Sequence, residues 1–225
     1  MKPLPSILKS LPPTTVIDSN IELSKYIALD LSVTNSELIA NKPENADDFE
    51  LFISNFLKKN NAEVAFGGYI EGRTLYQRST IFKNDSISER NIHIGLDLWT
   101  KVGTTVLAPI DGKVHSFKNN IGLGDYGPTI ILEHTVENEI FYTLYGHLSL
   151  ESIENLIVGT FFNKGEQIGN LGSSDVNGDY APHLHFQIIH NIEAYSGDYP
   201  GVCSTNDLNF YIENCPDPNL LLKIT

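Results

Sequence analysis

Residues 183–189 read HLHFQII, and this short run decides how the rest of the chain is interpreted. In a β-strand, successive side chains point to opposite faces, so His183 and His185 share one face while the apolar residues beside them share the other. Two imidazoles on one face of a strand are costly as core residues, because each buried ring nitrogen needs a partner. A metal ion or a reacting group would supply that partner.

A second run, HIGLD at residues 93–97, shows the same alternation. In a strand, His93 and Asp97 point the same way, and Gly95 between them leaves a gap without a side chain. This gap could hold an ion or a substrate. A further candidate is His147 in the run YGHLS, just past a predicted strand end, where functional side chains commonly lie.

Together these runs hold four histidines and one aspartate that could converge. Two imidazole nitrogens and one carboxylate oxygen suit zinc, with a fourth position left to water. A donor set without thiolate argues against an iron–sulfur cluster or a structural cysteine site. The sequence therefore predicts that two of the histidines and Asp97 bind the ion, while the other two histidines transfer protons.

Composition limits the class of protein. The 225 residues suffice for one sizeable domain or for a domain with a small appendage, and 41% hydrophobic with 19% charged residues excludes wholesale disorder. No apolar stretch approaches 18 residues, so no membrane span is expected. The net charge of −13 has the wrong sign for binding a phosphate backbone, which excludes nucleic acid as a partner. No secretory signal is recognised near the N-terminus, so a cytoplasmic location is favoured over non-classical export.

Glycine usage divides the chain, because residues 1–66 contain none of the 17 glycines. We expect a helical N-terminal appendage at 1–66, a β-rich domain at 67–200 and a C-terminal tail packed on it at 201–225. A capping pattern at Ser19 and Glu22 predicts a helix from about residue 20 into the thirties. A second helix, capped near Asn45, carries one apolar stripe formed by Phe49, Phe52, Ile53, Phe56 and Leu57.

The middle of the chain reads as many short strands separated by glycine turns. Their β-branched and aromatic content predicts a mainly β fold, an antiparallel sheet groove or barrel-sandwich, rather than parallel βαβ units. The candidate strands span 92–98, 105–108, 112–117, 129–134, 140–145, 167–171 and 183–189.

Five ordered motifs resemble those of the lysostaphin/LytM-type zinc peptidases, peptidase family M23, with its duplicated hybrid motif. They cover less than half the chain, from about residue 91 to 189. The motifs are H-x-x-x-D at 93–97, A-P-x-D-G-x-V at 108–114, Y-x-H-L-S at 145–149, G-x-x-I-G-x-x-G at 165–172 and P-H-x-H-F at 182–186.

The resemblance implies a role for each matching residue. The zinc ligands would be His93, Asp97 and His185, and the catalytic residues flanking the metal would be His147 and His183. It also implies an antiparallel sheet groove with zinc on its floor, and substrates that are peptide bonds in bacterial peptidoglycan, often next to glycine. The expected function is thus a zinc metalloendopeptidase, in which one of the two catalytic histidines serves as acid and base and the other stabilises the oxyanion. Which histidine is the base stays open.

Several positions depart from the family pattern and leave the substrate open. Gln187 stands where a glutamate is common, and the segments 124–128 and 172–181 replace simpler turns that rim the groove in the family. The runs 125–128, 141–147 and 215–219 resemble a branch sometimes fused to aminotransferase-type domains, which is a cytoplasmic context.

The alternatives are a zinc hydrolase of a small cytoplasmic amide or peptide, and a non-catalytic binding module of the same fold. A phosphocarrier or acyl-carrier-like β-sandwich would share the 108–114 turn, but it would not need zinc ligands on two strands. The expected partner is a peptide or a peptidoglycan fragment, and the oligomeric state is left open.

The remaining candidate residues are more ambiguous. His115, His134 and His190 are expected to be structural or exposed, with His134 a candidate for a hydrogen-bond network under the site. Tyrosines could line a groove or simply pack, and these are Tyr69, Tyr76 and Tyr126. Cys203 and Cys215 could be reduced or bridged.

Overall fold

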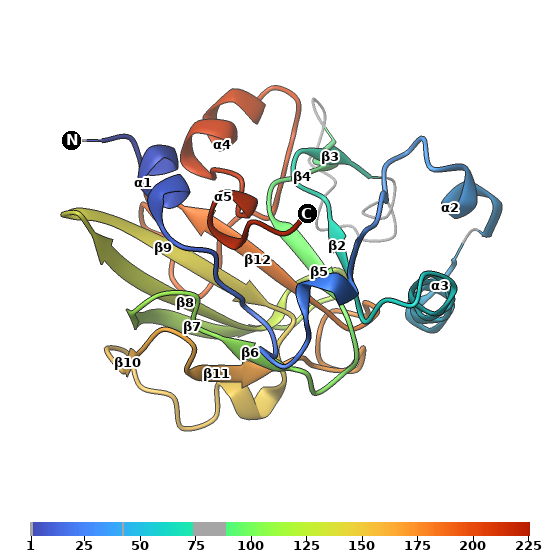
Figure 1. Ribbon diagram of the computed structural model, residues 1–225, viewed down its shortest axis with the longest axis horizontal. Helices are drawn as coiled ribbons and strands as arrows, with labels where there is room; N and C mark the ends of the chain where they lie inside the picture. The colour runs from blue at the N-terminus through green and yellow to red at the C-terminus, as the bar shows by residue number, and fades with distance from the viewer. Residues whose placement is uncertain (1, 42, 74–88) are drawn as a thin grey trace.

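The computed structural model describes residues 2–41, 43–73 and 89–225. Over these residues the chain builds an eight-stranded sheet in which all neighbours are antiparallel except the first pair, which is parallel (Figure 1). In spatial order its strands are β1 (Tyr26–Ala28), β2 (Val64–Gly67), β5 (Leu96–Trp99), β12 (His183–Ile189), β9 (Glu139–Gly146), β8 (Gly127–Val136), β7 (Gly112–Asn120) and β10 (Phe161–Phe162). The predicted fold class, mainly β with a large antiparallel sheet and few helices, is confirmed.

Two smaller sheets complete the β structure of the described residues. One pairs β6 (Thr105–Leu107) with β11 (Gln167–Asn170), and the other has the order β13 (Val202–Cys203), β4 (Ile92–His93) and β3 (Glu71–Gly72). The single strand predicted at 92–98 is therefore two strands, in different sheets. The chain changes sheets at Ile94 and Gly95, where the Ile94 amide donates to the Gly201 carbonyl oxygen at 3.0 Å.

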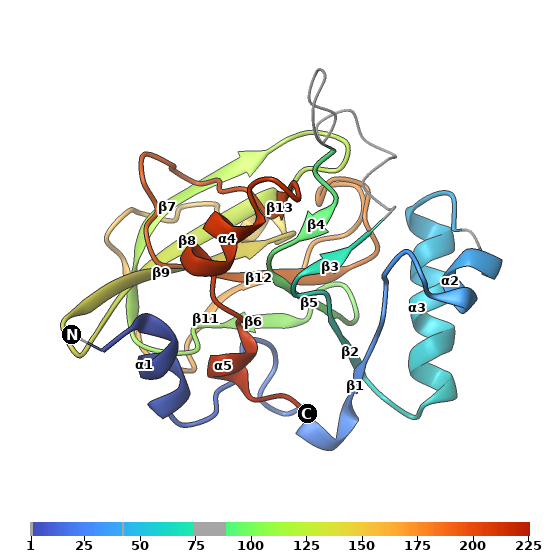
Figure 2. The same ribbon diagram turned by 90° about the horizontal axis from the view of Figure 1, so that it is seen from above.

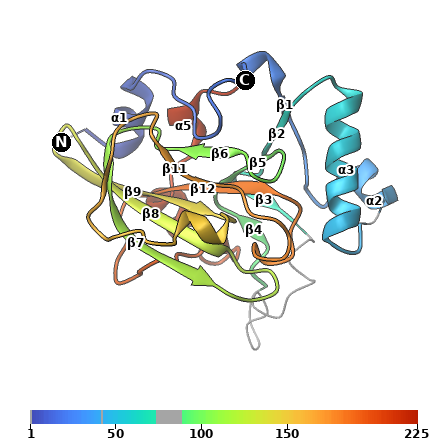
Figure 3. The ribbon, with the colours of Figure 1, turned by 90° about the horizontal axis from the view of Figure 1, so that it is seen from below.

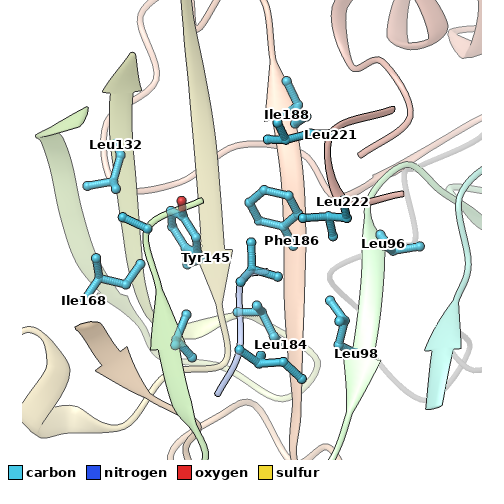
Figure 4. Packing of buried hydrophobic residues seen from close by; sticks show 14 of the residues in the cluster. Leu96, Leu98, Leu132, Tyr145, Ile168, Leu184, Phe186, Ile188, Leu221 and Leu222 are labelled. Atoms are coloured by element: carbon cyan, nitrogen blue, oxygen red, sulfur yellow. The ribbon is translucent and has the colours of Figure 1, made fainter. Parts of the chain in front are cut away.

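One face of the large sheet carries the main hydrophobic core. Alternate residues of β12 point into it, Leu184, Phe186 and Ile188, as period-two alternation requires (Figure 4). This face is covered by α1 (Leu4–Ser10), by α5 (Asn219–Leu222) and by the β6/β11 pair. α1 and α5 contact each other, so the two ends of the described chain close the same side of the molecule (Figure 2).

The other face of the sheet carries two separate hydrophobic clusters. The first packs against α4 (Leu208–Asn214) and contains Cys203 and Cys215, which are buried and not bridged. The second packs against α3 (Ala46–Lys59), beside β2 (Figure 3). Asp97, His183 and His185 also lie on this face, because the residues that alternate with them in β5 and β12 point into the main core.

The prediction of a helix capped near Asn45 is confirmed, because the Asn45 side chain accepts a hydrogen bond from the Asp48 amide at the start of α3. The helix predicted from residue 20 into the thirties is wrong. There the structure has the short 3-10 turn η1 (Leu23–Lys25) and then β1, with α2 (Ser36–Asn41) later. Pairing of β1 with β2 satisfies the backbone, and this tertiary contact overrides the local capping pattern.

The predicted N-terminal segment 1–66 is joined to the sheet through β1 and β2, and the predicted boundary falls inside β2. The domain division itself stays a prediction. A further 3-10 turn is η3 (Leu150–Ser152). Among the described residues, no helix is both long and apolar enough to cross a membrane.

Candidate metal centre

Three buried donors converge where β4, β5 and β12 meet. His93 Nε2 lies 2.8 Å from His185 Nδ1, and Asp97 Oδ1 lies 3.2 Å from each of these nitrogens. The strand register explains the meeting, because His185 on β12 is the cross-strand partner of Asp97 on β5. These three side chains form a group that could hold a metal ion.

The hydrogen bonds of the two rings fix their tautomers. His93 Nδ1 lies 2.8 Å from the Gly68 carbonyl oxygen, which can only accept, so Nδ1 carries the proton and Nε2 presents a lone pair. His185 Nε2 lies 3.0 Å from the Gln187 side-chain oxygen. The Gln187 amide is oriented by donating to the Pro200 carbonyl oxygen and to Cys215 Sγ, so His185 also donates outward and turns a lone pair inward.

The lone pairs of His93 Nε2 and His185 Nδ1 therefore face each other and Asp97 Oδ1, and no proton lies between the two nitrogens. Burial lowers the pKa of His93 to about 4, so this ring is neutral at pH 7. A buried arrangement of this kind is repulsive on its own and favourable around a cation. The residues present thus fit a bound metal ion.

The second carboxylate oxygen of Asp97 is held by a buried arginine. Arg73 Nη1 donates to Asp97 Oδ2 at 2.6 Å, and Arg73 Nε donates to Glu71. Glu71 in turn accepts from the Leu31 amide at 3.0 Å. Burial alone would raise the pKa of Asp97, but His93 and Arg73 hold it well below its ordinary value. Asp97 is therefore ionised and offers Oδ1 toward the two imidazoles.

The other two histidines of the prediction, His147 and His183, lie beside this group. Their ring centroids are 4.2 Å apart, and His183 Nε2 lies 4.0 Å from Asp97 Oδ1. His147 Nδ1 donates to the Asn177 carbonyl oxygen, and His183 Nδ1 donates to the Ala181 carbonyl oxygen. Each neutral ring thus keeps Nε2 unprotonated.

Burial lowers the pKa of both rings. His147 adopts a left-handed backbone, with φ of 63°, immediately after β9. Strained backbone of this kind is typical of functional sites. Trp99 stacks on His183, with ring centroids 5.6 Å apart.

These five side chains open onto a cavity of about 290 Å³. Aromatic side chains line much of it, including Tyr126, Tyr180, Tyr199 and Phe49. Tyr126 Oη lies 3.4 Å from His185 Nε2. A tyrosine predicted as a groove candidate is therefore at the site.

The other predicted candidates have different places. Tyr69 donates to the Cys215 carbonyl oxygen, and Tyr76 lies outside the described residues. Three histidines do not line the cavity, namely His115, His134 and His190. His134 is buried, bonded to the Asp111 carbonyl oxygen and to Thr143.

Sequence reasoning missed several residues of the site. Arg73 and Gly68 precede the first motif by about twenty residues, and no spacing pattern connects them to it. The sequence pattern predicts Phe49 only as part of an apolar helix stripe, whereas the structure places it in the cavity wall. The role of Gln187 could have been found, because it occupies the same strand face as His185, two residues away.

Comparisons with known proteins find similarity over part of this chain. Residues 91–196 match the model of Peptidase family M23. An uncharacterised metalloprotease of Haemophilus influenzae is 34% identical over 95 residues, which are 42% of this chain and 18% of that relative, so the matched segment spans less than a fifth of the relative's length.

Similar solved structures include the catalytic domain of the antimicrobial peptidase lysostaphin from Staphylococcus simulans, with 26% identity over 54% of this chain and 80% of that chain and a TM-score of 0.36. Csd3 from Helicobacter pylori is 24% identical over 65% of this chain and 36% of that chain, with a TM-score of 0.36. Residues 91–196 are thus similar to Peptidase family M23, and the three donors that could hold a metal ion, His93, Asp97 and His185, lie within this matched segment.

Proposed function

We propose that the protein is a zinc-dependent peptidase that hydrolyses amide bonds in peptidoglycan-type peptides. The observation that carries the proposal is the convergence of three buried donors from His93, Asp97 and His185 beside two further imidazoles. Donors of a tetrahedral zinc ion, bound at about 2.0–2.1 Å, lie roughly 3.3 Å apart. The 2.8, 3.2 and 3.2 Å separations are close to this value, and the nitrogen and oxygen donor types suit zinc.

His93, Asp97 and His185 would hold the ion. A zinc ion bound there supplies a Lewis acid that polarises the scissile carbonyl and makes water nucleophilic at neutral pH. Arg73 keeps the second oxygen of Asp97 occupied, so that Asp97 offers a single oxygen to the ion. Gln187 orients the His185 ring by accepting a hydrogen bond from Nε2, the nitrogen that points away from the ion.

His147 and His183 would carry the proton transfers. A neutral imidazole with a free Nε2 can accept a proton from water and return it to the leaving amine. The second ring, once protonated, can donate to the developing oxyanion. The backbone carbonyl oxygens of Asn177 and Ala181 fix both tautomers, so neither ring has to reorient before it accepts a proton. The presence of all five side chains supports an active peptidase over a non-catalytic binding module.

A second candidate, hydrolysis of a short soluble peptide or small amide, is favoured by the size of the cavity. Its volume of about 290 Å³ is just below the range of roughly 300–1,000 Å³ that is typical of ligand pockets. The net charge of −13 supports the same candidate, because an acidic protein is repelled by anionic wall polymers.

The test combines elemental analysis with a substrate panel. We expect the purified protein to bind one zinc ion per chain and to release new amino groups from soluble muropeptides or from short glycine peptides. His185→Ala should lose both properties. His190→Ala is the matched control, because His190 is exposed and pairs only with Glu139 among the described residues. A zinc-loaded parent that cleaves nothing in the panel, or a His185→Ala variant that still cleaves, would contradict the proposal.

A further inference from the structure

Parts of the cavity wall come from outside the segment that matches the family. Phe49 on α3 lines it from the N-terminal side of the sequence. The segment 199–202 lines it from the C-terminal side. Both segments therefore border the space around the three donors, although both lie outside residues 91–196.

The wall formed by α3 is anchored at both ends. α2 and α3 form the connection between β1 and β2, which are parallel neighbours in the large sheet. A crossover that begins and ends in one sheet is held against it by both strands. This geometry makes α3 a fixed wall rather than a detachable flap.

Phe49 is the side chain through which α3 reaches the site. It is 4% exposed and packs in one cluster with Ala181 and Trp99. Ala181 supplies the carbonyl oxygen that accepts from His183, and Trp99 stacks on the same imidazole. The Phe49 ring therefore bounds the cavity on the His183 side.

The second wall, formed by residues 199–202, is also held by strand pairing. β13 pairs with β4 so that Val202 lies opposite His93. A Cβ atom on Gly201 would lie only 1.9 Å from Tyr126 Oη and 3.2 Å from His185 Cε1. A side chain at position 201 would overlap Tyr126, so only glycine lets the backbone of this wall lie so close to the site.

We propose that these two walls restrict the metal cavity to short peptides, and that Phe49 sets the limit on the His183 side. The inference rests on the proposed function, since it specifies the substrate class of the same site. A long or polymeric strand needs continuous space on both sides of the scissile bond, because each extended residue spans about 3.3–3.6 Å. The two walls border the cavity with structure that is anchored in strands.

The test measures ligand size without relying on turnover. Zinc is replaced by Co²⁺, whose visible spectrum changes when a hydroxamate binds the metal, and acetohydroxamate is compared with pentaglycine hydroxamate. We expect the parent to bind acetohydroxamate and to bind the pentaglycine probe weakly. Phe49→Ala should bind the pentaglycine probe about tenfold or more tightly than the parent, because removing a ring enlarges the cavity.

Two further variants keep the test decisive. Phe52→Ala is the matched control, since Phe52 lies on the same helix with its ring centroid 6.0 Å from that of Phe49 but does not line the cavity. It should resemble the parent. Phe49→Leu keeps an apolar side chain in the cluster, so its gain in affinity for the pentaglycine probe should be smaller than that of Phe49→Ala. Because it removes less of the core, this variant keeps the test valid if Phe49→Ala misfolds.

The outcomes separate the two proposals. Equal binding of pentaglycine hydroxamate by the parent and both Phe49 variants would overturn the inference while leaving the metal centre intact. The same gain in Phe52→Ala would also overturn it. Failure of the parent to bind Co²⁺ or acetohydroxamate would instead overturn the proposed function on which it rests.

Discussion

Binding of zinc at the proposed metal centre should raise the thermal stability of this protein, and the structure gives the reason. The lone pairs of His93 and His185 face each other at 2.8 Å, with the Asp97 carboxylate 3.2 Å from both. A cation that binds the folded state relieves this repulsion. Because His185 lies 88 residues from Asp97 in the sequence, the unfolded chain does not bring the three donors together.

The magnitude follows from mass action. Zinc at a hundred times its dissociation constant stabilises the folded state by about 2.7 kcal/mol. For a chain of this size, each kcal/mol shifts the midpoint of thermal unfolding by about 2–4 °C. The expected difference between zinc-loaded and chelator-stripped protein is therefore about 5–11 °C.

Scanning calorimetry at pH 7 on three proteins checks this prediction. The parent should show the shift, and His147→Ala should keep it, because His147 is not among the three donors. His185→Ala should show none. A stripped parent, verified as metal-free by elemental analysis, that unfolds at the same temperature as the loaded protein would refute the reasoning, and so would a full shift in His185→Ala.

Three other predictions concern single side chains. His147→Ala should lower kcat about 100- to 10,000-fold with zinc stoichiometry unchanged, as measured by peptide assay and elemental analysis. Gln187→Met removes the acceptor that orients His185 and should weaken zinc binding about 10- to 100-fold in competition with a fluorescent chelator. Burial lowers the pKa of His134 from 6.5 to about 4, so its contribution to stability is present above pH 6.5 and is lost as the pH falls toward 4. Between these limits the parent should lose about 3 kcal/mol more than His134→Gln in urea unfolding, and parallel curves for the two proteins would contradict this assignment.

Strand alternation predicted much of the fold because one face of the sheet is buried in a continuous core. The expected strands at 112–117, 129–134 and 140–145 lie within β7, β8 and β9. In β12 the predicted division of faces is confirmed, with Leu184 and Phe186 in the core and the two histidines on the other side. The helix predicted from residue 20 failed because a local capping pattern carries no information about a partner strand nearly forty residues away.

The candidate site could be predicted only in part, because some of its contacts depend on residues far apart in the sequence. The predicted donors His93, Asp97 and His185 do converge. They could be predicted because each lies in a short motif with the right chemistry. Their supporting partners could not be found, because hydrogen bonds to Gly68 and Arg73 depend on how separate strands meet in space. The residues that bound the cavity depend on the same tertiary arrangement.

The geometry of the site and the packing of the core depend on the register of one strand. β12 pairs on one side with β5, where His185 lies opposite Asp97, and on the other side with β9, where His185 lies opposite Gly146. The residue after Gly146 is His147, so this single register brings the proposed ligand His185 and the proposed proton-transfer residue His147 together. A shift by one residue would turn the histidines into the core and the Phe186 ring into the cavity. Burial of Phe186, which is worth about 3–5 kcal/mol by comparison with truncation to alanine, therefore also holds the metal donors in place.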